Sequence, residues 1–221
     1  MIIAKQIVKN VSTRAGELTI LQDINLHINA GESVAIVGSS GSGKSTLLAL
    51  LAGLDNPSQG EIHLDGQPLH VMSEDQRAML RAERVGFVFQ SFQLLQGLTA
   101  LENIALPLEL NRSDNAEHLA HHYLQKVGLS ERGHHYPNQL SGGEQQRVAI
   151  ARAFASQPSV LFADEPTGNL DGDTGHRIAD LLFELNRDED CTLVLVTHDD
   201  QLAARCDRRL RMNSGRLSEE G

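Results

Sequence analysis

The sequence feature that most constrains this chain is a glycine-rich loop, GSSGSGKST, at Gly38–Thr46. The apolar run Ser33–Val37 precedes the loop and the leucine-rich run Leu47–Leu51 follows it, so the pattern indicates a strand, a loop and a helix. Glycines leave backbone N–H groups free to face an anion, and the helix adds its unpaired amino-terminal donors. The pattern therefore predicts a nucleoside triphosphate site, and its flanks argue against a flexible serine–glycine turn.

The loop predicts a role for two side chains in particular. Lys44 is expected to bridge the β- and γ-phosphates, and the hydroxyl of Ser45 is expected to ligate Mg²⁺. The residues predicted to hold the nucleotide here are Gly38, Ser39, Ser40, Gly41, Ser42, Gly43, Lys44, Ser45 and Thr46.

Composition limits the classes of protein that fit. The chain has 221 residues and a net charge of -10, with no run of lysine and arginine, which argues against binding nucleic acid. It lacks a secretory leader pattern and any apolar stretch near the ~20 residues that cross a bilayer. We therefore expect a cytoplasmic protein that reaches a membrane only through a partner. The two cysteines, Cys191 and Cys206, show no metal or redox spacing.

Strand and helix patterns alternate along most of the chain. Apolar and polar residues alternate over 24–28, which is typical of an antiparallel strand. Uninterrupted apolar strands are expected at 85–89, 160–163 and 192–197, with helical patterns between them. The alternation predicts an α/β fold with a mostly parallel sheet core and an antiparallel β subdomain at the amino terminus.

The stretch 92–139 breaks this alternation, because it reads as helices with few β-branched runs. Thr99–Glu102 forms a capping box that opens one of them, and Pro107 is expected to kink or stop it. We expect one domain over 1–221, divided into a β subdomain and core at 1–91, an inserted helical subdomain at 92–139, and core again at 140–221.

Each of four expected strands runs into a polar group suited to phosphate chemistry. Besides the glycine loop, these groups are Gln90, Asp164 with Glu165, and His198. In an open α/β sheet, ligands bind outside the carboxyl ends of the strands, so parallel neighbours would bring the four groups to one γ-phosphate. A polar residue after one strand is commonplace, but the set of four favours a catalytic site.

Phosphoryl transfer needs charge neutralisation and an oriented nucleophile, which predicts a role for each group. Asp164 is the expected carboxylate near Mg²⁺, and Glu165 is the expected base for the attacking water. Gln90 is expected to ligate the metal or position water, and His198 to hydrogen-bond the γ-phosphate. The predicted catalytic residues are therefore Glu165, His198 and Gln90, and the predicted metal ligands are Ser45, Gln90 and Asp164.

The motif LSGGEQQ at Leu140–Gln146 resembles the signature of ABC-transporter ATPases. Along the whole chain, the motifs follow an order that resembles the order in that family. The order is glycine loop, glutamine, signature, Asp-Glu pair, Asn169–Asp171 and histidine. Physically, the motif supplies a second helix amino terminus with exposed glycine amides. The resemblance implies that this second anion site binds ATP held by another copy, in a head-to-tail dimer around two ATP molecules. It adds Ser141, Gly142, Gly143, Gln145 and Asp171 to the expected nucleotide-binding residues.

Segments 86–92, 98–103 and 164–171 resemble the subgroup of this family that contains LolD, MacB and FtsE. The resemblance implies a partner permease of the LolC/MacB-like kind, with few transmembrane helices and a large periplasmic domain. It implies a place on the cytoplasmic face of the inner membrane. The functions that the resemblance implies are export, extraction of lipoprotein or lipid, or mechanotransmission.

Two other functions remain open. A soluble ABC ATPase, not coupled to transport, would usually carry two cassettes, or a coiled-coil or zinc insertion, and a basic surface, none of which is evident in this sequence. A regulatory nucleotide switch without turnover is disfavoured because Glu165 and His198 are both present.

One departure from the family concerns the nucleotide base. By spacing, Val11 occupies the place where an aromatic residue usually stacks on adenine. Valine offers no π face, so we expect weak discrimination between ATP and GTP.

Two weaker patterns lie between residues 92 and 139. Three histidines at helical spacing, with two more nearby, could form a divalent-metal site, although a solvated helix face is favoured. Three leucines after Gln90 are expected to be exposed in a groove for a partner's coupling helix, with core packing as the alternative. The histidines are His118, His121 and His122, and the leucines are Leu94, Leu95 and Leu98.

Overall fold

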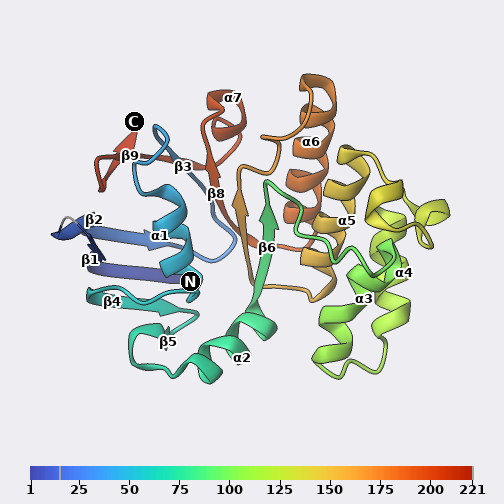
Figure 1. The fold of residues 1–221 in the computed structure, drawn as a ribbon, viewed down its shortest axis with the longest axis horizontal. Coiled ribbons are helices and arrows are strands. Elements are labelled where there is room, and N and C mark those ends of the chain that lie inside the picture. The colour runs from blue at the N-terminus through green and yellow to red at the C-terminus, as the bar shows by residue number, and fades with distance from the viewer. Residues whose placement is uncertain (15, 221) are drawn as a thin grey trace. The chain divides into compact units, whose positions relative to one another are not determined.

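The structure of this protein is a computed structural model that describes residues 1–14 and 16–220. The chain divides into two compact units. Unit 1 comprises Met1–Arg81 and Thr192–Gly221, and unit 2 comprises Ala82–Cys191. Most elements of each are labelled in Figure 1.

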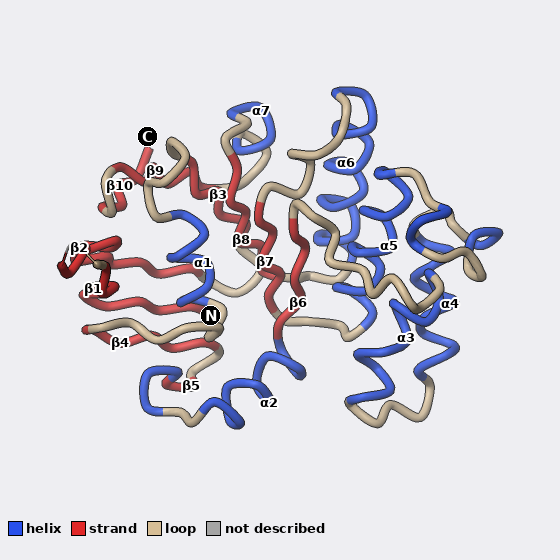
Figure 2. The backbone as a smooth tube through the Cα atoms, viewed as in Figure 1, coloured by secondary structure: helices blue, strands red, loops and turns tan. Residues whose placement is uncertain are grey.

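An antiparallel sheet forms the first part of unit 1, with its strands in the order β2-β1-β4-β5. β1 pairs with both β2 and β4, and these strands lie side by side in Figure 2. Within β2, residues 24, 26 and 28 are buried and residues 25 and 27 are exposed, which confirms the predicted antiparallel strand. The four strands are β1 (Ile2–Thr13), β2 (Gly16–Ile28), β4 (Gln59–Leu64) and β5 (Gln67–Pro68).

The second set of strands in unit 1 is mostly parallel, in the order β10-β9-β3-β8. β3 runs parallel to both β8 and β9, while β9 and β10 form an antiparallel hairpin. The apolar side chains of β3 and β8 are fully buried, as expected for strands covered on both faces. These strands are β3 (Ser33–Val37), β8 (Thr192–Thr197), β9 (Arg208–Asn213) and β10 (Arg216–Glu220).

The helix after the glycine loop, α1 (Lys44–Leu51), anchors the loop to unit 1. Its four leucines are buried, and the helix packs against β2, β4 and β8. Its carboxyl-terminal cap is Ala52, and Gly53 follows with φ +69°, a left-handed conformation that glycine adopts without a Cβ clash. The predicted strand–loop–helix order is therefore confirmed.

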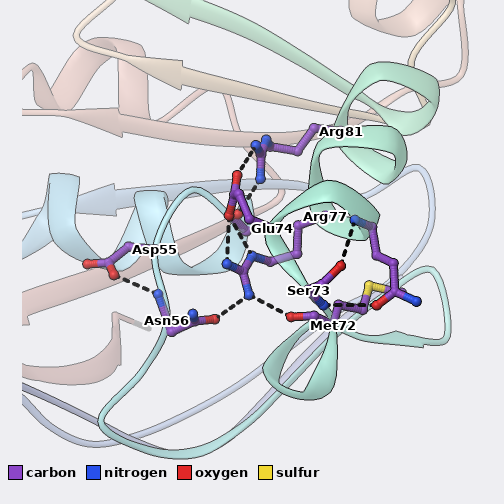
Figure 3. A network of polar contacts seen from close by, with 9 residues as sticks. Asp55, Asn56, Met72, Ser73, Glu74, Arg77 and Arg81 are labelled. Carbon is purple, nitrogen blue, oxygen red and sulfur yellow. Dashed lines mark hydrogen bonds and ion pairs between the residues drawn. The ribbon is translucent and has the colours of Figure 1, made fainter.

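Polar contacts anchor the start of α2 (Glu74–Arg84), which follows the short 3₁₀ turn η1 (Leu69–Val71) (Figure 3). The buried Arg77 donates to Asn56 Oδ1 at 2.8 Å and to the carbonyl oxygen of Met72 at 2.9 Å. The carboxylate of Glu74 accepts from both Arg77 and Arg81 at 2.6 Å. The network ties α2 to the segment that leaves α1. A four-residue helix, α7 (Asp200–Ala203), follows β8.

Unit 2 is built around the buried helix α5, which packs against β6 and against α3, α4 and α6. Val148, Ala151 and Phe154, on the predicted inner face of α5, are buried. β6 and β7 pair in parallel. The elements are β6 (Val85–Phe89), α3 (Ala100–Leu110), α4 (Ala116–Lys126), η2 (Ser130–Arg132), η3 (Pro137–Gln139), α5 (Gly142–Ala155), β7 (Val160–Asp164) and α6 (Gly172–Asp188).

The capping box predicted for α3 is present, because Thr99 accepts from the Glu102 amide and the Glu102 side chain accepts from the Thr99 amide. Of the two alternatives predicted at Pro107, a kink or an early stop, the early stop is wrong, since α3 continues to Leu110. Leu108, one residue beyond the proline, is buried at 4% exposure. Burial of Leu108 offsets the hydrogen bond that a proline removes from a helix.

Leu94 was expected to be exposed and is instead buried, while Leu95 is 50% exposed and Leu98 lies between these extremes. The cause is Asn103, whose buried side chain bonds the N–H and the carbonyl of Leu95 and the carbonyl of Leu98. These bonds fix the loop so that Leu94 packs inward.

Among the described residues, each helix is too short or too polar to traverse a lipid bilayer.

Candidate functional site

Unit 1 places the glycine loop beside His198. β3 and β8 are parallel neighbours with Val37 opposite Thr197. The loop begins directly after Val37, and the exposed His198 directly follows Thr197. The two predicted groups therefore leave adjacent strands at the same end of unit 1.

Two glycines of the loop are required by the fold itself. Gly38 passes so close to β9 that a Cβ atom would lie 2.3 Å from the carbonyl oxygen of Met212. Gly43 has φ +108°, and a Cβ there would lie 2.8 Å from a methyl carbon of Leu21. Any larger residue at either position would push the loop away from its supporting strands.

The start of α1 is rich in unused donors. Its amino-terminal cap is Gly43, which supplies no side-chain acceptor, and the first turn holds no acidic residue. The amides of that turn have no intrahelical acceptor, because they precede the first helical hydrogen bonds. Lys44 is 9% exposed, and its ammonium donates to the carbonyl oxygens of Gly38 at 2.8 Å and Ser39 at 3.0 Å. A positive, uncapped helix terminus of this kind fits a phosphate group.

In unit 2, Gln90 and Glu165 follow paired strand ends. β6 and β7 are in register with Phe89 opposite Asp164, so the two residues leave the sheet side by side. Gln90 Nε2 donates to Asn169 Oδ1 at 3.1 Å, and Asn169 Nδ2 donates to the carbonyl oxygen of Gln90 at 2.9 Å. This reciprocal pair fixes the position of Gln90. Sequence reasoning gave Asn169 no role, since only folding brings it to Gln90.

Glu165 adopts an unusual backbone conformation. Its φ is +47°, in the left-handed region that non-glycine residues seldom occupy. The carbonyl oxygen of Glu165 accepts from Gly168 at 3.0 Å, and the fully buried Gln146 donates from Nε2 to the next carbonyl, that of Pro166, at 2.6 Å. Strained residues persist when their surroundings hold them, and they are frequent at functional sites. No sequence signal marked the strain at Glu165.

The signature motif begins helix α5 with Ser141 as the amino-terminal cap. The Ser141 hydroxyl accepts from the Glu144 amide at 3.3 Å and donates to Glu144 Oε2 at 2.8 Å. The Ser141 amide and hydroxyl, both donors to this carboxylate, hold the pKa of Glu144 below its usual value. Arg132 also lies 3.2 Å from Glu144. Unlike the start of α1, this terminus is therefore already capped by its own side chains.

A groove of about 640 Å³ within unit 2 brings together most of the predicted signature-side residues. Ser141–Glu144 and Asn169–Asp171 both line it, together with the cations Lys126, Arg147 and Arg177. The contact between α5 and α6 here is close, since a Cβ at Gly143 would lie 2.6 Å from the Thr174 methyl group.

Asp171, which lines the groove, and Gln145, the remaining residue predicted for this side, both make local hydrogen bonds. Asp171 caps α6 by accepting from the Thr174 amide at 3.0 Å, which lowers the pKa of its carboxyl. Gln145 is not among the groove residues, and its Nε2 donates to the carbonyl oxygen of Leu140 at 3.1 Å.

The structure shows where the residues of two weaker sequence predictions lie. Val11 is half-buried opposite Leu18, near the tip of the β1–β2 hairpin. His118, His121 and His122 are exposed on α4. In the described part of the chain they are not among the side chains that approach closely enough to share a metal ion, so the solvated helix face is favoured.

The glycine loop between β3 and α1, set among parallel strands and covering helices, defines the P-loop nucleotide-binding class of α/β proteins. Comparison with known proteins narrows this class. Residues 21–168 match the family model described as ABC transporter, and the chain belongs to that family.

The sequences of known relatives match this chain over nearly its whole length. The ABC transporter ATP-binding protein YbbA of Escherichia coli K12 is 60% identical over 96% of this chain and 94% of its own length. The lipoprotein-releasing system ATP-binding protein LolD of Bordetella pertussis is 49% identical over 92% of this chain and 89% of its own. The dimeric structure of the cassette MJ0796 bound to ADP and Pi matches with a TM-score of 0.92 and 40% identity, covering 100% of this chain and 98% of that one.

These likenesses confirm the predicted fold class, an ABC cassette with an antiparallel amino-terminal sheet, a mainly parallel core and a helical subdomain. They also confirm the predicted resemblance to the LolD subgroup. The chain is therefore an ABC transporter ATPase cassette, the ATP-binding subunit of a transporter.

Proposed function

We propose that this cassette hydrolyses ATP as a head-to-tail dimer and thereby drives a membrane permease that carries a large periplasmic domain. The observation that carries the proposal is the contrast between two helix termini. The start of α1 is uncapped and cationic, so it suits a triphosphate held by the chain itself. The start of α5 is self-capped and opens on a groove shared with Asp171, so it suits a ligand delivered from outside.

Within one chain, the loop Gly38–Thr46 holds the triphosphate. Binding exchanges the hydrogen bonds that Lys44 makes to the Gly38 and Ser39 carbonyls for bonds to phosphate oxygens. Ser45, Gln90 and Asp164 would hold Mg²⁺, since hydroxyl, amide and carboxylate oxygens are the donors that this ion prefers. When bound, Mg²⁺ neutralises charge on the phosphates.

Glu165 accepts the proton of the attacking water, because a carboxylate within hydrogen-bond reach of that water can act as a general base. Its left-handed backbone sets the direction of the side chain, and the contact of Gln146 with Pro166 holds the adjoining loop. Gln90, positioned by Asn169, orients water and metal, and His198 donates a hydrogen bond to the γ-phosphate.

The second copy completes each site with its own signature. Ser141, Gly142, Gly143 and Gln145 of one protomer face the triphosphate held by the other, and Asp171 couples the two sites across the twofold axis. To donate to phosphate, the Ser141 hydroxyl turns away from Glu144. The dimeric structures of MJ0796, at 40% identity over the whole chain, support this arrangement.

The permease is of the LolC/MacB-like kind, because the chain is 49% identical to an ATP-binding protein of a lipoprotein-releasing system. On this proposal, the cassette sits on the cytoplasmic face of the inner membrane and powers export, extraction of lipoprotein or lipid, or mechanotransmission. Half-exposed Leu95 lies in the segment proposed to receive the permease's coupling helix. Identification of the membrane protein that co-purifies with the tagged cassette tests this step, and exclusive recovery from the soluble fraction would favour the uncoupled ATPase.

Glu165→Gln tests the catalytic proposal most directly. We expect hydrolysis to fall by about 100-fold or more, because removal of a general base costs that order of magnitude. Nucleotide binding should survive, so MgATP should trap a dimer in size-exclusion chromatography. Glu109→Gln, at an exposed position on α3, is the matched control and should hydrolyse ATP normally. Normal turnover in Glu165→Gln would contradict the role of Glu165.

A further inference from the structure

We propose that Glu61, His63 and His70 bind a divalent transition-metal ion of the Zn²⁺ type on the antiparallel sheet of unit 1. Each of the three side chains offers one ligand atom, and these atoms all lie within 4.8 Å of one another. The site uses no residue of the glycine loop, of the signature or of the groove in unit 2. Among the residues that the structure describes, these three are the histidine, cysteine or carboxylate side chains that lie close enough together to hold a metal.

The strand β4 supplies two of the ligands. Glu61 and His63 are two residues apart, so they project from the same face of the strand. His63 Nε2 lies 3.6 Å from Glu61 Oε2. With Zn–N and Zn–O distances near 2.0–2.1 Å, tetrahedral ligand atoms lie roughly 3.3 Å apart, so this pair is already close to the required spacing.

The turn that follows the β4–β5 hairpin brings His70 back to the same face. His70 lies in η1, and its ring centroid is 5.4 Å from that of His63 at an interplanar angle of 59°. One ligand nitrogen of each ring lies within 4.8 Å of the other and of a carboxylate oxygen of Glu61.

The tautomer of His70 favours metal binding. Its Nδ1 lies 3.3 Å from the carbonyl oxygen of Ile62. A carbonyl can only accept, so Nδ1 carries the proton and Nε2 of the neutral ring keeps a free lone pair. Metal-bound histidines commonly donate their second ring nitrogen to a backbone carbonyl in this way, which fixes the ring and raises its basicity.

The donor set determines the class of ion. Two imidazoles and one carboxylate suit Zn²⁺ and its transition-metal neighbours, whereas Mg²⁺ prefers oxygen ligands. The side chains of His63 and Glu61 are 30% and 56% exposed, so water can complete the coordination shell. The bound ion would link β4 to η1, and because the unfolded chain lacks this geometry, binding would stabilise the folded cassette.

The test uses untagged full-length protein in saturating MgCl₂, titrated with ZnCl₂ by calorimetry against a competing chelator. We expect a Zn²⁺ site whose affinity falls at least about 10-fold in His63→Gln and in His70→Gln, the usual cost of losing one ligand or its support. Thermal unfolding should shift upward with Zn²⁺ in the unaltered protein and much less in these variants. Anomalous diffraction from Zn²⁺-soaked crystals should place the ion between the two rings.

His121→Gln and His122→Gln on α4 are the matched controls, because they remove exposed histidines that do not gather around one point. Glu61→Gln is the second variant, since it changes an exposed side chain and should leave the metal-free unfolding temperature unaltered. Loss of Zn²⁺ affinity in Glu61→Gln supports the site even if a histidine variant folds poorly. Unchanged affinity in both Glu61→Gln and His70→Gln, or loss of the site in the α4 variants, would overturn the proposal.

Discussion

The ammonium group of Lys44 donates a hydrogen bond of 2.8 Å to the carbonyl oxygen of Gly38 and so closes the glycine loop on itself. A second bond, to the carbonyl oxygen of Ser39, measures 3.0 Å. These bonds hold the charge within a loop that buries most of the lysine side chain. The lysine is therefore positioned before any phosphate arrives, which lowers the cost of ordering it during binding.

Lys44→Met tests this arrangement. Methionine fills a similar volume but cannot donate to phosphate, so ATP hydrolysis should fall by about 100-fold or more, as when a preorganised donor is lost. The thermal midpoint should change little, because methionine keeps the packing of the buried side chain and the two carbonyls lose only part-buried hydrogen bonds. Lys5→Met, at an exposed position on β1, is the control. Near-normal turnover in Lys44→Met would exclude a phosphate-binding role for the lysine.

A composite site predicts complementation between two inactive chains. Lys44→Met inactivates the glycine loop of one chain. Ser141→Arg, at the residue that caps α5, blocks the signature motif of the other chain. In a mixed dimer one site receives both lesions and the other receives none. An equal mixture should therefore recover up to about a quarter of normal hydrolysis, since half the dimers are mixed and each has one intact site. A mixture as inactive as its components would argue against sites that work independently.

Val11 predicts weak selection of the base. The residue is half-buried opposite Leu18 and offers only aliphatic contact. The ratio of kcat/KM for ATP over GTP should therefore be small, and strong preference for ATP would contradict this expectation. Val11→Tyr should lower the KM for both nucleotides about five- to tenfold, because stacking contributes about 1 kcal/mol or more with any base.

Features that depend on local sequence were predictable. The glycine loop, the strand before it and the leucines after it define their structure within about twenty residues, because strand and helix periodicities and glycine chemistry act locally. The capping box at Thr99–Glu102 was predictable for the same reason. The early stop expected at Pro107 was not correct, since burial of Leu108 depends on packing that no local pattern records.

Features that depend on contacts between distant segments were not predictable. The bond between Gln90 and Asn169 joins residues 79 positions apart, and Gln146 of α5 bonds the carbonyl of Pro166, which directly follows the left-handed Glu165. The histidines illustrate the same limit. The helical spacing of the three histidines on α4 is visible in the sequence. His63 and His70, in contrast, come together only because the chain reverses direction at the β4–β5 hairpin.

The contact between Ser33 and Asp207 predicts a pH-dependent contribution to stability. Asp207 Oδ2 accepts from the Ser33 amide at 2.8 Å and from its hydroxyl at 2.7 Å, which ties the start of β3 to the segment before β9. The Ser33 hydroxyl and amide hold the pKa of Asp207 below its usual value. The contribution is therefore present above the unfolded pKa of about 3.9 and is lost as the pH falls through the lower folded pKa.

Asp207→Asn should lower the free energy of unfolding by about 1 kcal/mol at pH 7, a modest value because the carboxylate is exposed and water weakens its bonds. Urea unfolding at pH 7, 5 and 3 measures the effect. The difference between the unaltered protein and the variant should hold from pH 7 to 5 and begin to shrink at pH 3, because the unfolded carboxyl binds a proton below its pKa of about 3.9 while the folded carboxylate resists protonation. Asp114→Asn, at an exposed position before α4, is the control and should unfold normally at each pH. A difference that stays constant down to pH 3 would mean that the charge of Asp207 does not stabilise this contact.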